Sequence, residues 1–240
     1  MQSITKKGEI KTIIDKCLSV YNLDGLPACL QIVRTELLSY KIKFPLLEYA
    51  AEQLEIGFVD KDVIQSIFII RSWDTIGGNV LIGIFLRDML QSNYTQAIEE
   101  TVKVTATADI WYICDIIGER IYGHALRQHF DQTIEHFRKL SEHESPWVIR
   151  SLGAGAHNAI KKGLPPKQVE EVFKFLLNLA NHRHKEVRQG IGWAAKTTAK
   201  FHPSIIDKYR SQLTDKKRTA GWFTSKVKIG LARNSYAQGN

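Results

Sequence analysis

Apolar residues recur at helical spacing along almost the whole of this chain, and this periodicity restricts its fold more than any other feature. The first two runs, 9–21 and 26–39, have apolar residues three or four positions apart. Further runs follow at 45–56, 60–72, 78–92, 95–107, 110–121, 123–141, 146–161, 166–181, 184–200, 203–213 and 215–232. No alternating pattern of useful length, such as a half-buried strand shows, interrupts them. The chain is therefore predicted to be all-α.

The breaks between these runs predict an array of helix pairs. Residues that favour turns or helix starts stand at Asp24-Gly25, Pro45, Gly77-Gly78, Gly123, Pro165-Pro166 and Pro203. Helices of about 10–18 residues with short connections form antiparallel pairs, here at a period of about 40, as in HEAT-type repeats. No linker rich in Pro, Gly or Ser divides the 240 residues. We expect one domain over 1–240, a curved α–α superhelix of about 12 helices with a concave surface.

Basic residues are concentrated in the C-terminal third. Residues 1–160 contain 16 Lys and Arg against 20 Asp and Glu, whereas residues 161–240 contain 17 against 5. A cationic surplus confined to 161–240 is the electrostatic footprint of a protein that contacts nucleic-acid phosphates. The alternative is a solvated basic face that serves solubility only. Membrane-surface binding is disfavoured, because the cations are spread through amphipathic helices rather than bunched beside a long apolar one.

The sequence also indicates the compartment. No apolar run approaches the roughly 18 residues that a transmembrane helix needs. The first residues, Met1 to Lys7, lack the apolar stretch of a signal peptide. Three cysteines, Cys17, Cys29 and Cys114, are odd in number and have no paired spacing. We therefore expect a reduced, cytoplasmic chain without a membrane partner, a metal or a cofactor.

Trp111 and Asp115 are the first pair of side chains suited to a charged ligand. They are four residues apart, so an indole and a carboxylate project from one face of a helix. The alternative is that the tryptophan belongs to the core. Asp115 would then be a surface residue or the internal ion-pair partner of Arg120 or Arg150.

Two further segments add a cation and a second indole. Ser145-Pro146 is typical of a helix start, which places Arg150 near the positive end of the helix dipole, where anions bind. Gly190 and Gly192 stand close to Trp193, and glycine lets another group approach closely. Two aromatic faces, a carboxylate and an arginine at a helix start together suit a nucleotide clamp.

Taken in order, these motifs resemble those of the AlkD-type DNA alkylation repair proteins. The shared pieces are Trp111-x3-Asp115, Trp147-x2-Arg150 with Arg150 35 residues after the aspartate, and Ile191-Gly192-Trp193 with Ala199-Lys200 and Pro203. Lys41-Ile42-Lys43-Phe44-Pro45 and Lys217-Arg218-Thr219-Ala220 add an early and a late match, so the resemblance runs from about residue 30 to 230. The order and the Asp-to-Arg spacing on an all-helical chain make the combined signal specific.

The resemblance implies a HEAT-like-repeat DNA glycosylase that excises cationic alkylated purines, 3-methyladenine and 7-methylguanine, from duplex DNA. Alkylation puts a positive charge on the base, so the developing deoxyribose cation needs a neighbouring anion more than the leaving base needs an acid. Asp115 fits that catalytic role and would also position the attacking water. Trp111 and Trp193 would line the sugar with electron-rich faces. In this family the base is not flipped into a deep pocket.

We expect a monomer whose partner is double-stranded DNA, with Arg150 on a backbone phosphate. The expected DNA-contacting residues are Arg150, Trp147, Arg183, Arg188, Lys196, Lys216, Lys217 and Arg218. Some branches of the family lack glycosylase activity, so the alternative is a non-enzymatic protein that binds branched or damaged DNA. A HEAT-type protein-interaction scaffold would leave the clustered basic residues unexplained.

Overall fold

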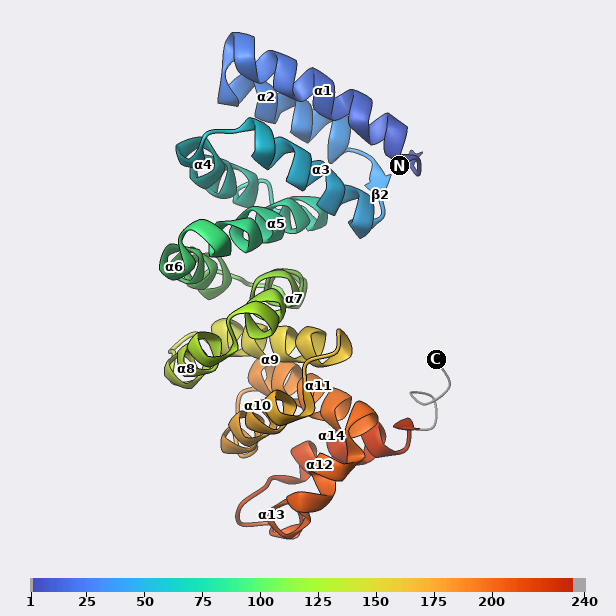
Figure 1. Ribbon diagram of the computed structural model, residues 1–240, viewed down its shortest axis with the longest axis vertical. Coiled ribbons are helices and arrows are strands. Elements are labelled where there is room, and N and C mark those ends of the chain that lie inside the picture. Colours follow the sequence, from blue (N-terminus) through green and yellow to red (C-terminus); the bar gives the residue numbers. More distant parts are fainter. Residues whose placement is uncertain (1, 235–240) are drawn as a thin grey trace. The chain divides into compact units, whose positions relative to one another are not determined.

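The computed structural model describes residues 2–234, and fourteen α-helices form nearly all of the regular structure in that range (Figure 1). The predicted all-α array is therefore confirmed. The chain divides into two compact units, one ending at Ile98 and the other beginning at Glu99. A single domain over the whole chain stays a prediction. Within residues 2–234, every helix is too short or too polar to span a lipid bilayer.

The first unit is built on helices that pack in series. They are α1 (Lys7–Asp24), α2 (Leu26–Ile32), α3 (Phe44–Gly57), α4 (Asp60–Arg71), α5 (Ile76–Ser92) and the first turn of α6 (Tyr94–Ala106). Helix α1 packs on α2 and α3, and α5 packs on α3 and α4. The predicted break at Gly25 is present, with φ at +81°, a value that glycine adopts without strain. The helix start predicted at Gly77-Gly78 is also present, because the Thr75 hydroxyl accepts a bond from the Gly78 amide at 3.0 Å.

Two short features of the first unit were not predicted. Strand β1 (Ser3–Ile4) pairs in parallel with β2 (Lys41–Ile42), with Ser3 opposite Lys41. A π-helical turn, η1 (Val33–Leu37), continues α2 within the run predicted as one helix over 26–39. Two-residue strands are too short to show an alternating pattern, and a π turn keeps the apolar spacing of a helix closely enough to escape notice.

The second unit arranges its helices in two rows. One row runs α7 (Trp111–Gln128), α9 (Pro146–Lys161), α11 (Lys185–Phe201) and α14 (Gly221–Leu231), each packed on the next (Figure 1). The other row contains α8 (Phe130–Leu140), α10 (Pro166–Asn178), α12 (Pro203–Lys208) and α13 (Arg210–Thr214). Ile117, Leu152 and Ile191, one each from α7, α9 and α11, are fully buried. Each such side chain contributes roughly 1.5–3 kcal/mol of transfer free energy.

Some predicted helix boundaries in this unit were wrong. Gly123 was expected to separate two helices, but α7 continues through it. A Cβ atom at Gly123 would lie 2.7 Å from Asn158 Oδ1, so this glycine serves close packing rather than a turn. The run 203–213 divides at Tyr209, and the run 215–232 becomes helical only at Gly221.

Glycines also let α7, α9 and α11 approach at the level of their backbones. A Cβ atom on Gly118 would overlap the Ser151 carbonyl of α9, and one on Gly153 would overlap the backbone at Gly190 of α11. A Cβ on Gly190 would in turn lie 2.5 Å from the Arg150 carbonyl oxygen. The group that approaches Gly190 is therefore the backbone of α9. Together, the contacts at these three glycines place α7 beside α9 and α9 beside α11.

Candidate functional site

A pocket of about 300 Å³ in the second unit brings together the three expected catalytic residues and two of the expected DNA-contacting residues, Arg150 and Lys196. It lies across α7, α9, α11 and α14, the helices of the closely packed row. Its lining residues are Trp111, Asp115, Arg150, Gln189, Trp193, Lys196 and Lys226. Both indoles, the carboxylate and the arginine of the predicted nucleotide clamp thus share one pocket.

Two of the lining residues, Asp115 and Arg150, belong to an ion-paired triad that Glu186 completes, with one residue from each of three helices. The Arg150 guanidinium donates to Asp115 through Nε at 2.9 Å and Nη2 at 2.8 Å, and to Glu186 through Nη1 at 2.7 Å. Asp115 and Arg150 are only 9% and 7% exposed. Burial alone would lower the pKa of Arg150, but the hydrogen bonds and charges of Asp115 and Glu186 outweigh it and raise that pKa. Two carboxylates against one guanidinium leave the triad with a net charge of −1.

The internal ion pair considered for Asp115 is therefore present, and its partner is Arg150. Arg120 instead donates through Nη1 to the Ile116 carbonyl at 3.0 Å. Three of the five N–H groups of Arg150 donate to carboxylates, which leaves two for another acceptor. The phosphate contact expected of Arg150 stays a prediction.

The two indoles of the pocket differ in their surroundings. Trp111 begins α7 and is 55% exposed, and Arg150 Cζ lies 5.9 Å from its ring centroid. Trp193 is half-buried, and its ring stacks on the His157 imidazole with centroids 3.9 Å apart. Trp111 thus presents a free aromatic surface, whereas Trp193 is held by a neighbour.

One face of α11 supplies three pocket residues and the Glu186 of the triad, of which the sequence analysis found only part. Glu186, Gln189, Trp193 and Lys196 follow one another at spacings of three, four and three residues, so they share a helix face. Glu186 and Gln189 were missed, although their spacing from Trp193 was a usable signal. Lys226 of α14, whose Nζ lies 3.5 Å from Gln189 Oε1, was also missed, because no local pattern relates it to α11.

Helix α9 begins as predicted, with Ser145 at the N-cap and Pro146 in the first turn. The Ser145 hydroxyl caps no amide of α9 and instead donates to the Ala106 carbonyl at 3.3 Å. Trp147, one position further on, is half-buried and does not line the pocket. Its expected DNA contact stays a prediction.

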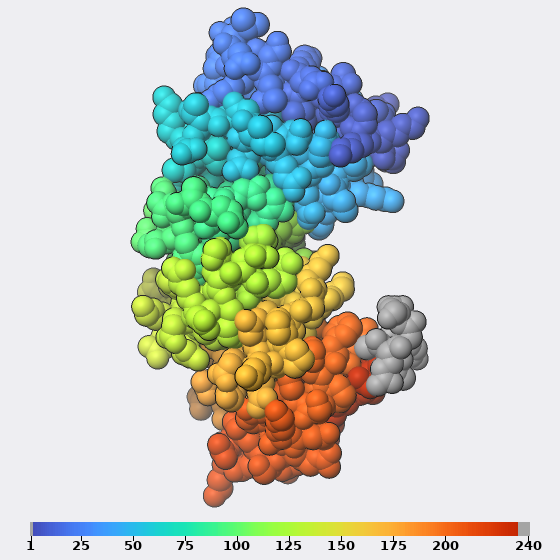
Figure 2. Space-filling model, in the orientation of Figure 1, coloured from blue at the N-terminus to red at the C-terminus, as the bar shows by residue number. Residues whose placement is uncertain are grey.

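The remaining predicted DNA contacts lie outside the pocket, mostly on the surface. Arg183 is exposed in the connection before α11, and Arg188 Cζ lies 5.6 Å from the Trp222 ring centroid. Lys216, Lys217 and Arg218 are exposed in the turn before α14. In the space-filling view, the described part of the C-terminal third gathers in one orange-to-red region (Figure 2).

A second pocket, of about 200 Å³, adjoins the first and shares Trp193 and Lys196 with it. Among the described residues its lining is His157, Lys161, Trp193, Lys196, Thr197, Lys200, Phe201 and Arg233. Four of these residues are cationic and none is acidic. Burial and the charges of Arg233 and Lys226 lower the pKa of Lys196. The pocket therefore favours an anion such as a phosphate.

The buried imidazole of His157 makes stability depend on pH. Burial, together with the charges of Lys161 and Lys196, lowers the pKa of His157 to about 4. The unfolded chain, with a histidine pKa near 6.5, therefore takes up a proton first as the pH falls. We expect the free energy of unfolding to decrease between pH 6.5 and about 4, by up to about 3 kcal/mol, and to gain nothing from this group above pH 6.5.

Denaturant unfolding of the wild type and of His157→Phe across this pH range measures that contribution. The free energy of unfolding of the wild type minus that of His157→Phe should decrease as the pH falls, because phenylalanine cannot take up a proton. A constant difference from pH 7 to 4 would contradict a buried neutral imidazole.

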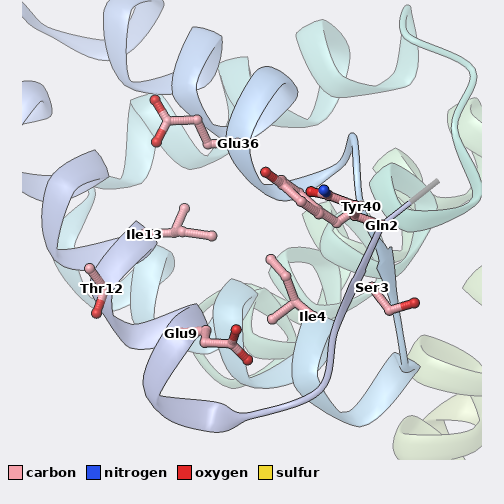
Figure 3. A pocket seen from close by; sticks show the side chains of 8 residues that line it. All are labelled: Gln2, Ser3, Ile4, Glu9, Thr12, Ile13, Glu36 and Tyr40. Carbon is pink, nitrogen blue, oxygen red and sulfur yellow. The ribbon is translucent and has the colours of Figure 1, made fainter.

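A pocket of about 610 Å³ in the first unit has no comparable chemistry (Figure 3). Ile4, Ile13 and Tyr40 contribute apolar surface to it. Its two carboxylates are already engaged, since Glu9 accepts from the Lys6 amide at 3.1 Å and Glu36 pairs with Lys16.

Comparison with known proteins identifies the family of this chain. A sequence model of the family described as DNA alkylation repair enzyme matches residues 80–222, more than half of the 240 residues. The match includes Trp111, Asp115, Arg150 and Trp193, but not the early segment 41–45. Comparisons with curated proteins and with solved structures gave no match. The chain belongs to the family of DNA alkylation repair enzymes.

Proposed function

We propose that this protein is a DNA glycosylase that excises cationic alkylated purines, such as 3-methyladenine and 7-methylguanine, from duplex DNA. A role in DNA alkylation repair follows from family membership. The observation that carries the finer proposal is a fixed carboxylate, Asp115, in one pocket with the indoles of Trp111 and Trp193. This is the arrangement that a developing deoxyribose cation requires: a nearby anion and electron-rich faces.

The triad would hold Asp115 in a fixed position while keeping a net negative charge beside the sugar. The bidentate bond from Arg150 holds the carboxylate plane, so little reorganisation is needed when charge develops on the sugar. Glu186 pairs with the same guanidinium, so the triad keeps a net negative charge. Each Asp115 oxygen keeps a lone pair with which it would orient the attacking water.

Cations around the carboxylate would hold the DNA backbone on either side of the lesion. Lys196 and Lys226 line the pocket itself, and Lys161, Lys200 and Arg233 line the adjoining one. A shallow pocket beside such cations suits a sugar–phosphate unit better than an extruded base. We therefore propose that the base is excised without being flipped.

Release of free bases from methylated DNA tests the proposal. Purified protein is incubated with methylated genomic duplex, and chromatography quantifies free 3-methyladenine and 7-methylguanine against an incubation without protein. Release above that background is the expected result. Tight DNA binding without any release would contradict the proposal.

One observation favours a second candidate, non-enzymatic binding of branched or damaged DNA. Both oxygens of Asp115 accept hydrogen bonds from Arg150, which offsets much of the carboxylate charge. A binding protein would need the basic surface and the aromatic faces, and the triad would serve stability alone. The excision assay separates the two candidates.

The exposed turn Lys216-Lys217-Arg218 should contribute strongly to duplex affinity. Neutralising all three with glutamine is expected to weaken binding similarly for every sequence. It should also reduce the magnitude of the slope of log affinity against log salt concentration by about 0.9 for each lost phosphate contact. Affinity is measured by fluorescence anisotropy from low to high salt.

The matched control neutralises Lys6, Lys11 and Lys61, three exposed cations of the first unit. It lowers the net charge equally, so a loss specific to the turn reports local contacts rather than total charge. Wild-type affinity that does not change with salt would contradict backbone binding.

A further inference from the structure

The imidazole of His157 and the indole of Trp193 form a stacked pair between α9 and α11. Their ring centroids are 3.9 Å apart and their planes differ by 22°. Trp193 lines both adjoining pockets, whereas His157 lines only the cationic one. The imidazole therefore contacts the indole at the cationic pocket and does not line the Asp115 pocket.

A chain of hydrogen bonds through Thr197 links the two residues of this pair. The Thr197 hydroxyl donates its single hydrogen to the Trp193 carbonyl at 3.0 Å. His157 Nδ1 lies 2.6 Å from the same hydroxyl oxygen, and with the hydroxyl hydrogen directed at the carbonyl this contact corresponds to the tautomer that carries its hydrogen on Nδ1. His157 is 9% exposed, and both its ring plane and its Nδ1–H are thus held.

We propose that His157 is a positioning residue for Trp193, holding the indole face against the Asp115 pocket where the deoxyribose is bound. This role rests on the glycosylase function proposed above. It adds a residue that touches neither the sugar nor the base and that acts through the indole alone.

The charges facing His157 support this role. Lys161 on α9, Lys196 and Lys200 on α11, and Arg233 after α14 line the pocket that contains it, and within residues 2–234 no acidic residue does. Burial and the charges of Lys161 and Lys196 lower the pKa of His157, so the imidazole is neutral at physiological pH. A protonated ring would draw electron density from the indole and weaken its attraction for a cation on the opposite face.

Single-turnover excision of 7-methylguanine by four variants tests the role. His157→Ala should lower the rate about threefold to tenfold, the range expected for loss of an aromatic pair, with duplex affinity unchanged. His157→Phe keeps the stack and should restore most of the rate, whereas His157→Leu fills the site without stacking and should not. His136→Ala on α8, outside both pockets, is the matched control and should match the wild type.

A double-mutant cycle distinguishes action through Trp193 from general destabilisation. In a Trp193→Ala background, His157→Ala should cause no further loss of rate. Additive losses, or equal rates for the wild type and His157→Ala, would overturn the inference and leave the glycosylase proposal standing. If His157→Ala fails to fold, the comparison of His157→Phe with His157→Leu decides the question.

Absence of excision by the wild type would overturn the proposed function, and the positioning role in catalysis with it. Iodide quenching of Trp193 emission shows independently whether the pairing exists. Trp193 should be more accessible in His157→Leu than in His157→Phe, with Trp193→Phe giving the background. Equal quenching would overturn the pairing itself.

Discussion

Asp115→Asn is expected to lower the single-turnover rate of 7-methylguanine excision by about 10²–10³-fold. Asparagine keeps the shape of the side chain and one acceptor oxygen for Arg150, but it removes the negative charge. The triad would change from a net charge of −1 to neutral, so the developing deoxyribose cation would lose its stabilising anion. Duplex affinity should stay unchanged or rise slightly, because an anion near the phosphates has gone.

The matched control is Asp131→Asn, which removes an exposed carboxylate from the first turn of α8 and should leave the rate unchanged. Trp111→Ala and Trp193→Ala should each lower the rate less than Asp115→Asn, because each indole supplies only one face. Equal rates for the wild type and Asp115→Asn would remove Asp115 from the mechanism.

Arg150→Ala is expected to lower the free energy of unfolding by about 3–5 kcal/mol. The substitution would leave Asp115 and Glu186 without the cation that both carboxylates share. Arg150 is 7% exposed, so water cannot replace its hydrogen bonds easily. Urea unfolding at neutral pH, followed by circular dichroism, measures the loss.

The control is Arg183→Ala, an exposed arginine whose removal should change stability by no more than about 0.5 kcal/mol. A loss below about 1 kcal/mol for Arg150→Ala would show that the triad is not a major part of the fold. If Arg150 also holds a phosphate, the salt dependence of binding by a still-folded Arg150→Lys variant should be preserved, since the charge is kept.

Local spacing predicted the parts of the site that lie on one helix. Trp111 and Asp115 share a face of α7, and Ser145-Pro146 begins α9, as the sequence indicated. The Asp115–Arg150 pair could be considered because the motif order pointed to both residues. The link from Arg150 to Glu186 crosses 36 residues between two helices, and no periodicity within either helix encodes it.

Gly123 was misinterpreted for the same reason, because its role depends on a contact with another helix. A glycine within a helical run is compatible with a turn or with close packing, and only the neighbouring helix decides between them. At Gly123 that neighbour is Asn158, 35 positions away in the sequence. The stack of His157 on Trp193 was missed for the same reason, because its partners also belong to different helices.

The glycine contacts of α7, α9 and α11 have a consequence for the dimensions of the Asp115 pocket. Backbone touches backbone at Gly118 and Gly153, so the width of the Asp115 pocket follows from the separation of the helices rather than from the bulk of its lining side chains. For the glycosylase proposed above, an adduct larger than a methyl group would require wider helix spacing. A side chain at Gly118 or Gly153 would force two helix backbones apart, since its Cβ would overlap the Ser151 carbonyl oxygen or the Gly190 carbonyl carbon. Substitutions at these two buried glycines should therefore disturb the pocket more than substitutions of its lining side chains.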